Sequence, residues 1–250
     1  MILAKLRMFS WGRIMILGVY GKSKSGKTTL IENVVSRLTE EGFSVATVKH
    51  IKREGFTIDT EGKDTWRHAE AGARLVVASS DQETSFIVRG SVSIEKILET
   101  IQKNLDTDVI LVEGYKSSAF PKVAVGDIEE EENTVLRFKD KDEGMIEYIK
   151  SKIEFERVYN RLPLLDCQEC GFDCATFANK VISGEVDVED CKHYGRKSIC
   201  VTVDGKKVPL KKFPAEIFGN AVLAMLTSLR GVGDFGSAVI EVESPSKEER

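Results

Sequence analysis

Residues 14–29 decide the fold, and they read IMILGVYGKSKSGKTT. The first seven form an apolar run, which is typical of a strand buried on both faces of a parallel sheet. The next eight fit the pattern G-x-x-x-x-G-K-[ST], whose glycines let backbone N–H groups surround a phosphate. Apolar residues then recur at helical spacing from Lys27 to Thr39. A strand, a glycine-rich loop and a helix in this order predict a phosphate-binding loop.

Each position of this loop has a chemical role. We expect the Lys27 ammonium to contact the β- and γ-phosphates and the Thr28 hydroxyl to bind Mg²⁺. The positive end of the helix dipole faces the same anion. A chance match in a surface turn is the alternative, but the flanking strand and helix supply the required context. We therefore predict that nucleotide is held by Gly21, Lys22, Ser23, Lys24, Ser25, Gly26, Lys27, Thr28 and Thr29.

Two acidic residues are candidates for a second contact with Mg²⁺ or water. Glu113 follows the apolar strand 108–112, so it lies at the carboxyl edge of the sheet, where ligands bind. Asp108 begins that strand and belongs to the opposite edge. We predict that Glu113 acts with Lys27 and Thr28 as a catalytic group, the alternative being that it caps a turn. Asp59, in the loop after strand 44–49, is a weaker candidate.

The remaining pattern of the chain extends the same fold. Strands are predicted at 75–78, 85–88, 122–125 and 134–138, and helices at 64–73 and 93–105. Strands that alternate with helices indicate an α/β class, here a P-loop NTPase with a mainly parallel sheet flanked by helices. A smaller, cysteine-rich α+β region follows, with a hairpin at 198–210, a helix at 214–229 and a strand at 238–242.

Composition excludes several classes of protein. Of 250 residues, 42% are hydrophobic and 30% are charged, which argues against a mostly disordered chain. The net charge of −4 provides no broad basic field for nucleic acid or anionic lipid. No apolar run reaches the roughly 18 residues that span a bilayer. Lys5 and Arg7 interrupt the apolar N-terminus, so we predict no signal peptide and a cytoplasmic protein, with residues 1–12 as a loose arm or an over-extended start.

All five cysteines lie between Cys167 and Cys200. Four of them have the spacing Cys167-x2-Cys170-x3-Cys174-x16-Cys191, which is suited to an iron–sulfur cluster or to Zn²⁺. A cytoplasmic location disfavours disulfides. Cys200 falls in a predicted strand and is expected to be a small buried hydrophobe.

Several further segments carry a family resemblance. They are VKH at 48–50, GKDTWR at 62–67, AGA at 71–73, VEGYK at 112–116 and FPKV at 120–123. Together with the phosphate loop, residues 14–150 resemble the molybdopterin-guanine dinucleotide biosynthesis protein B (MobB) family. The resemblance implies a dimeric, GTP-binding, weakly hydrolysing adapter that acts beside the guanylyltransferase that attaches GMP to molybdopterin. No [NT]KxD element is present, so the preference for GTP over ATP rests on this resemblance alone.

The resemblance also implies roles for single residues. It places Lys49, His50, Asp64 and Arg67 on a polar surface near the nucleotide, and we take His50 and Arg67 as candidate nucleotide contacts. The alternatives are that His50 is a surface residue at a strand end and that Arg67 pairs with Asp64 on one helix face.

Residues 162–191 are similar to a small [4Fe–4S] domain found in corrinoid iron–sulfur proteins. The similarity implies a [4Fe–4S] cluster on the four cysteines. The commoner spacing has one more residue before the third cysteine, so zinc stays open as the alternative.

These patterns divide the chain into five parts: an arm at 1–12, a GTP-binding domain at 13–155, a four-cysteine domain at 156–195, a strand–helix–strand piece at 196–243 and a tail at 244–250. We predict an adapter of molybdenum-cofactor biosynthesis that forms a homodimer. Its expected partners are the guanylyltransferase, molybdopterin and molybdopterin's target enzymes. The alternative is a nucleotide-dependent metallochaperone, or a redox-linked P-loop NTPase, that loads metal centres.

Overall fold

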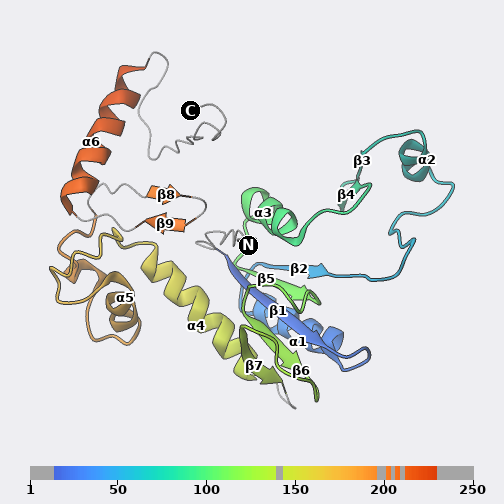
Figure 1. Ribbon diagram of the computed structural model, residues 1–250, viewed down its shortest axis with the longest axis horizontal. Coiled ribbons are helices and arrows are strands. Elements are labelled where there is room, and N and C mark those ends of the chain that lie inside the picture. Colours follow the sequence, from blue (N-terminus) through green and yellow to red (C-terminus); the bar gives the residue numbers. More distant parts are fainter. Residues whose placement is uncertain (1–13, 139–142, 196–200, 204–205, 209–211, 230–250) are drawn as a thin grey trace, which may run out of the picture. The chain divides into compact units, whose positions relative to one another are not determined.

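The computed structural model describes residues 14–138, 143–195, 201–203, 206–208 and 212–229. The chain divides into two compact units, Met1–Asn160 and Arg161–Arg250, whose elements are labelled in Figure 1. Predictions for the arm, for Cys200, for the strand at 238–242 and for the tail lie outside the described residues.

A five-stranded sheet forms the centre of the first unit, in the order β2-β5-β1-β6-β7. β1 (Met15–Gly21) lies between β5 (Val109–Glu113) and β6 (Lys122–Val125), and the edges are β2 (Val45–Lys49) and β7 (Thr134–Phe138). Every neighbouring pair is parallel. The parallel sheet predicted from the apolar runs is therefore confirmed, and all its carboxyl ends meet at one edge.

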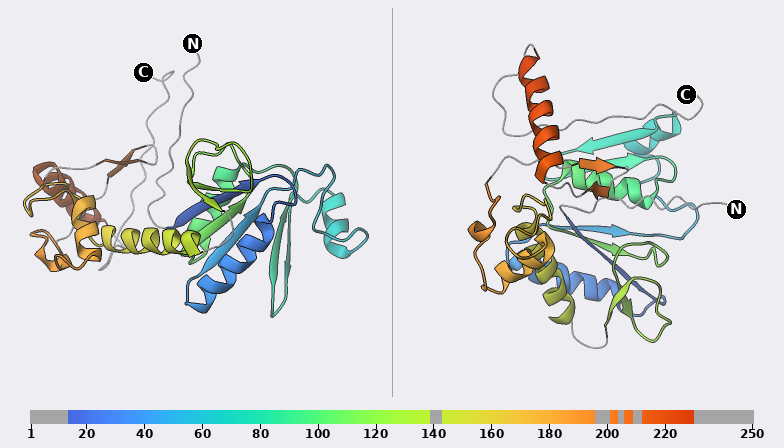
Figure 2. Two further views of the ribbon diagram at one scale, coloured as in Figure 1. Left: turned by 90° about the horizontal axis from the view of Figure 1, so that it is seen from below. Right: turned by 60° about the vertical axis from the view of Figure 1, so that its left-hand side comes forward.

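Alternate residues of the strands bury opposite faces of this sheet. Leu17, Val19 and Leu111 pack against α1 (Lys27–Glu40) and α4 (Glu143–Tyr159). On the other face, residues of β1, β5 and α3 (Ile94–Asn104) form the core together with Ile14 and Phe120. The members from these three elements are Ile16, Ile94, Leu98, Ile110 and Val112. Helices thus flank both faces of the sheet (Figure 2).

α4 has no counterpart among the helices predicted from the sequence. Its buried residues Met145, Ile146, Ile149 and Ile153 follow helical spacing and complete the core around β1 and α1. The helix is continuous across the 155/156 position at which the sequence pattern divides the chain, and the first unit extends to Asn160.

Between β2 and α3 (Ile94–Asn104) the chain forms a separate piece. α2 (Asp64–Glu70) contacts β3 (Leu75–Ser79), which pairs with β4 (Thr84–Val88) in a two-stranded antiparallel sheet. These two short strands occur at the predicted positions, but they do not join the five-stranded sheet.

The second unit contains the cysteines. Its elements are α5 (Cys174–Ile182), the 3-10 turn η1 (Val188–Asp190), the antiparallel strands β8 (Val201–Val203) and β9 (Lys206–Val208), and α6 (Lys212–Ser228). This small α+β region agrees with the prediction. Within the described ranges, every helix of either unit is too short or too polar to cross a bilayer.

Gly18 provides a test of packing in the sheet. A Cβ atom at this position would lie 2.7 Å from Cε2 of Phe120 and 2.8 Å from Cγ of Lys122. We expect Gly18→Ala to lower the free energy of unfolding by about 1–3 kcal/mol, because the added methyl overpacks this face.

Gly144 in α4 is the matched control. An added Cβ there meets nothing within 4 Å, and the residue is helical. Gly144→Ala should raise the free energy of unfolding by up to about 1 kcal/mol. Denaturant titration measures both variants, and an equal change in both would contradict the packing assigned to Gly18.

Candidate functional site

The phosphate loop joins β1 to α1 and is shaped by its glycines. A Cβ on Gly21 would lie 2.5 Å from the backbone oxygen of Val125 and 2.7 Å from Oγ of Ser25, so only glycine fits there. Gly26 precedes α1 with φ 88°, and Lys24 also has a positive φ of 62°. These left-handed residues turn the loop tightly, which is the conformation that exposes successive N–H groups to an anion.

Lys27 lies over this loop. Its Nζ donates to the carbonyl oxygens of Gly21, at 3.2 Å, and of Lys22, at 2.5 Å. Ser25 Oγ is 3.5 Å from the same atom. The ammonium group is therefore within reach of the loop's interior, where phosphate oxygens would replace the carbonyl oxygens as acceptors.

Thr28, Glu113 and Lys49 converge beside the loop. Thr28 Oγ1 lies 3.3 and 3.2 Å from the two carboxylate oxygens of Glu113, and Lys49 Nζ lies 3.1 Å from Oε2. Lys49 also donates to Thr28 Oγ1 at 3.4 Å. Strand register causes this meeting, since Glu113 of β5 is the direct partner of Val19 in β1 and of Lys49 in β2.

Thr28 and Glu113 fit a magnesium ion. Hydroxyl and carboxylate oxygens are its preferred protein ligands, and neighbouring octahedral ligands at 2.0–2.1 Å lie about 2.9 Å apart. The observed separations are only slightly longer. The Lys49 ammonium pairs with this carboxylate, and the Glu113 side chain is only 15% exposed.

The backbone after Glu113 is held in place by β1 and β2. Gly114 donates its N–H to Val19 at 2.9 Å, and the N–H of His50 donates to the Glu113 carbonyl at 2.9 Å. Gly114 has φ 99°, and a Cβ there would lie 2.9 Å from the Cβ of His50. The His50 ring stacks on Tyr115, with centroids 4.3 Å apart. His50 thus adjoins the site through Tyr115. The phosphate-loop pattern does not predict a role for Tyr115.

Asp59 and Arg67 have other partners. Asp59 Oδ1 accepts hydrogen bonds from the Thr60 N–H and the Thr65 hydroxyl, which order the loop before α2. Arg67 pairs with Asp64 at 3.6 Å along one face of α2. No hydrogen bond or ion pair between described residues joins Asp59 or Arg67 to the phosphate loop.

The four cysteines that the structure describes, Cys167, Cys170, Cys174 and Cys191, form no disulfide with one another. Cys167 and Cys170 are half-buried in the loop before α5, Cys174 begins α5, and Cys191 follows η1. The Asp166 carboxylate accepts the Cys174 N–H at 2.9 Å. Left-handed residues turn the loop sharply, namely Leu164, Asp166, Gln168 and Gly171.

Burial determines the protonation of the two inner thiols. It raises the pKa of Cys174 to about 11, and it also raises the pKa of Cys191. Both shifts favour the protonated thiols, so a metal or cluster that bound here would have to displace their protons.

Comparison with known proteins identifies the first unit. The family model "Molybdopterin guanine dinucleotide synthesis protein B" (MobB) matches residues 16–150. The chain belongs to the MobB family. A second model, described as "Putative Fe-S cluster", matches residues 162–193, which contain the four cysteines.

One relative covers nearly the whole chain. A protein of Methanocaldococcus jannaschii named "Putative molybdopterin-guanine dinucleotide biosynthesis adapter protein" is 30% identical over 237 residues, 91% of this chain and 97% of its own length. The adapter protein of Haemophilus influenzae is 35% identical over 118 residues, 46% of this chain and 65% of the relative. The crystal structure of Bacillus subtilis MobB matches 56% of this chain and 98% of its own, with 24% identity and a TM-score of 0.46.

The ion pair in the MobB domain can be measured by a double-mutant cycle. We expect Lys49→Met and Glu113→Gln to be coupled by about 0.5–1 kcal/mol in the free energy of unfolding, because one partner is partly exposed and the other nearly buried. Lys52→Met, which changes an exposed lysine in the next loop, is the control for lost charge. A coupling free energy of zero for Lys49 with Glu113 would contradict the assigned pair.

Proposed function

We propose that this chain is a GTP-binding adapter of molybdopterin-guanine dinucleotide biosynthesis that hydrolyses GTP slowly and carries a [4Fe–4S] cluster. The observation that carries the nucleotide part is the convergence of Lys27, Thr28 and Glu113 at the carboxyl edge of the sheet. The adapter part rests on membership of the MobB family and on the names of its relatives.

Nucleotide binding requires the loop to exchange internal contacts for contacts with phosphate. Lys27 leaves the carbonyl oxygens of Gly21 and Lys22 and neutralises the β- and γ-phosphates. Thr28 and Glu113 would hold Mg²⁺, which supplies positive charge to the phosphates as charge develops on them. Mg²⁺ at the Glu113 carboxylate would weaken its pair with Lys49 and favour release of Lys49, because two cations would then share one carboxylate.

Release of Lys49 connects the nucleotide site to the rest of the adapter. Lys49 ends β2, and the polar loop that follows it leads to α2 and the β3–β4 hairpin. His50, the next residue, is attached to the same strand end by its N–H and by its stack on Tyr115. Through this connection, nucleotide binding can change the conformation of the loop after β2. An adapter with slow turnover depends more on such a conformational change than on rapid hydrolysis.

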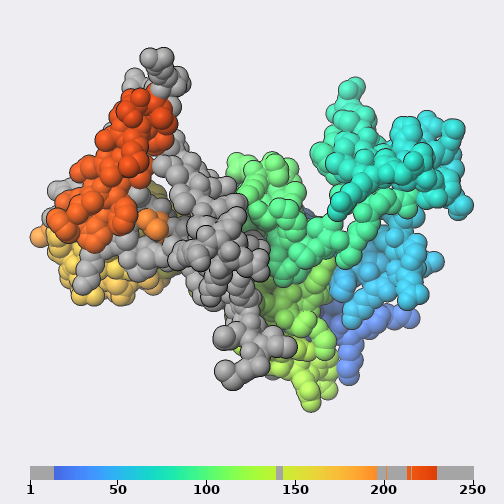
Figure 3. Space-filling model, turned by 45° about the horizontal axis from the view of Figure 1, so that its top comes forward, coloured from blue at the N-terminus to red at the C-terminus, as the bar shows by residue number. Residues whose placement is uncertain are grey.

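The β3–β4 hairpin favours a homodimer. Cross-strand partners Leu75 and Val88, and Val77 and Phe86, are all exposed on one face, with Phe86 70% exposed. An isolated two-stranded sheet is marginally stable unless its apolar face is covered. A second copy of this chain would cover this surface (Figure 3, residues 75–88). The other proposed partners are the guanylyltransferase, molybdopterin and the enzymes that receive the finished cofactor.

The family comparison supports a cluster in preference to zinc. The model described as "Putative Fe-S cluster" matches residues 162–193, which contain all four cysteines of the pattern. Four thiolates can hold a [4Fe–4S] cluster, each through a different iron.

Nucleotide titration tests the proposed GTP site. We expect GTP with Mg²⁺ to bind more tightly than ATP, and Lys27→Ala to weaken GTP binding by about tenfold to a hundredfold, since a hydrogen bond to a charged group is lost. Arg37→Ala, at the other end of α1, is the control and should retain wild-type affinity. Equal affinity for ATP and GTP would contradict the assignment to guanine nucleotides.

Anaerobic purification tests the cluster. The wild-type chain should contain about four iron and four sulfide per protein, and Cys174→Ser should lose the cluster because one of its four thiolates is removed. Cys200→Ser, which alters the fifth cysteine, should keep it. A wild-type protein that stays colourless after removal of bound zinc and reconstitution with iron and sulfide would refute the cluster.

A further inference from the structure

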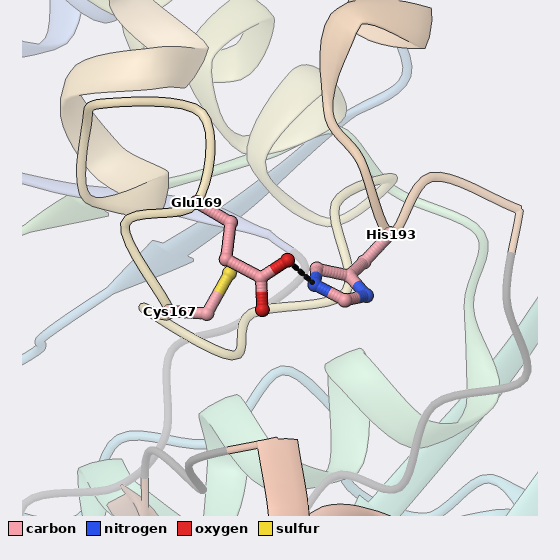
Figure 4. Close-up of side chains that lie close together, drawn as sticks. All are labelled: Cys167, Glu169 and His193. Carbon is pink, nitrogen blue, oxygen red and sulfur yellow. Dashed lines mark ion pairs between the residues drawn. The ribbon is translucent and has the colours of Figure 1, made fainter.

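A second group of metal-binding side chains lies beside the cysteine set. The ligand atoms of Cys167, Glu169 and His193 all fall within 4.8 Å of one another. Figure 4 shows the three side chains pointing toward a common space, with Cys167 and Glu169 on the loop before α5 and His193 on the segment after η1. The group therefore joins two segments of the second unit that are separated by the whole of α5.

The histidine is buried in this group. His193 is 2% exposed, and its Nε2 lies 3.0 Å from Oε2 of Glu169. The Glu169 side chain is 41% exposed, so solvent and ions reach the group from the carboxylate side. The imidazole, the carboxylate and the thiol thus form a set of three metal-donor groups that is open to solvent on the side of Glu169.

These donors suit one divalent transition metal. Thiolate sulfur, imidazole nitrogen and carboxylate oxygen are the three kinds of protein ligand for Zn²⁺, and ions of this class bind them at 2.0–2.3 Å. Ligands of one tetrahedral ion at those lengths lie about 3.3–3.8 Å apart. Small side-chain rotations bring the three atoms from their present separations to that geometry, which leaves a fourth position for water.

We propose that Cys167, Glu169 and His193 form a site for a single Zn²⁺-class ion in the chain that lacks its cluster. Glu169 and His193 are not part of the four-cysteine pattern. This site therefore differs from the proposed cluster site and shares only Cys167 with it. The thiolate of Cys167 belongs to both sites, so the ion and the cluster exclude each other. This mutual exclusion rests on the proposed cluster.

Occupancy of this site has a structural consequence. The ion would connect the loop before α5 to the segment after Cys191, the two segments that must come together for four thiolates to meet. In a chain that has bound a single ion, the two cysteine-bearing segments are therefore already close together, but Cys167 is not free to bind the cluster. The ion must leave before the cluster forms.

Cobalt titration of the full-length, cluster-free chain tests the site under anaerobic conditions. We expect one Co²⁺ per chain, visible absorption of a four-coordinate ion, and thiolate-to-cobalt charge transfer about one quarter as intense as that of a four-thiolate site. Zn²⁺ should displace the cobalt. Charge transfer from four thiolates, or no binding at all, would overturn the proposal.

Variants separate this site from the cluster. Glu169→Gln and His193→Gln should weaken Co²⁺ binding by about tenfold or more, as loss of a ligand does, and both should still form the cluster on reconstitution with iron and sulfide. Cys170→Ser and Cys174→Ser should show the opposite pattern. Glu189→Gln, an exposed acid in η1, is the matched control and should change neither.

Each result assigns one of the two sites. Cobalt binding that depends on Glu169 with no cluster in any variant would refute the proposed cluster and leave the single-ion site standing. Cobalt binding that ignores Glu169 but needs Cys170 and Cys174 would refute the single-ion site. Glu169 is partly exposed, so its variant is informative even where His193→Gln does not fold.

Discussion

The pairing of β5 with both β1 and β2 is the constraint on which the nucleotide site depends. β5 is inserted between two strands that precede it in the sequence, and its register places Glu113 opposite Val19 on one side and Lys49 on the other. Parallel pairing fixes all three residues at one edge of the sheet. A shift of one residue would turn the Glu113 side chain to the other face and separate it from Thr28.

The second unit obeys a different constraint. The segment 161–195 buries few apolar side chains, among them Leu162, Leu165, Phe177 and Ala178. Its buried cysteines are protonated in the metal-free state, and metal-binding free energy in such units is also folding free energy. We infer that the two units differ in what stabilises them: apolar packing in the first, and the proposed cluster together with packing in the second.

Local patterns predicted most of the fold and part of the site. The apolar run of β1, the glycine-rich loop and the run ending at Glu113 have short-range signatures, and their spacing sufficed to place Thr28 near Glu113. The ion pair of Lys49 with Glu113 depends on a register between two strands whose paired residues, such as Lys49 and Glu113, are far apart in the sequence, and no local pattern encodes this register. α4 has a helical pattern of apolar residues but contains no phosphate-binding or metal-binding motif, and it was not predicted. Asp59 and Arg67 have partners nearby in the sequence: Asp59 Oδ1 accepts from Thr65, and Arg67 pairs with Asp64.

We propose that Glu113 completes a magnesium site with Thr28 when nucleotide binds. The most direct test is the affinity for GTP with and without Mg²⁺, measured for the wild-type chain and for Glu113→Gln. We expect Mg²⁺ to strengthen GTP binding by the wild-type chain, and Glu113→Gln to lose most of this increase while keeping its affinity for GTP in the absence of Mg²⁺. An equal increase in both proteins would contradict a magnesium site that contains Glu113.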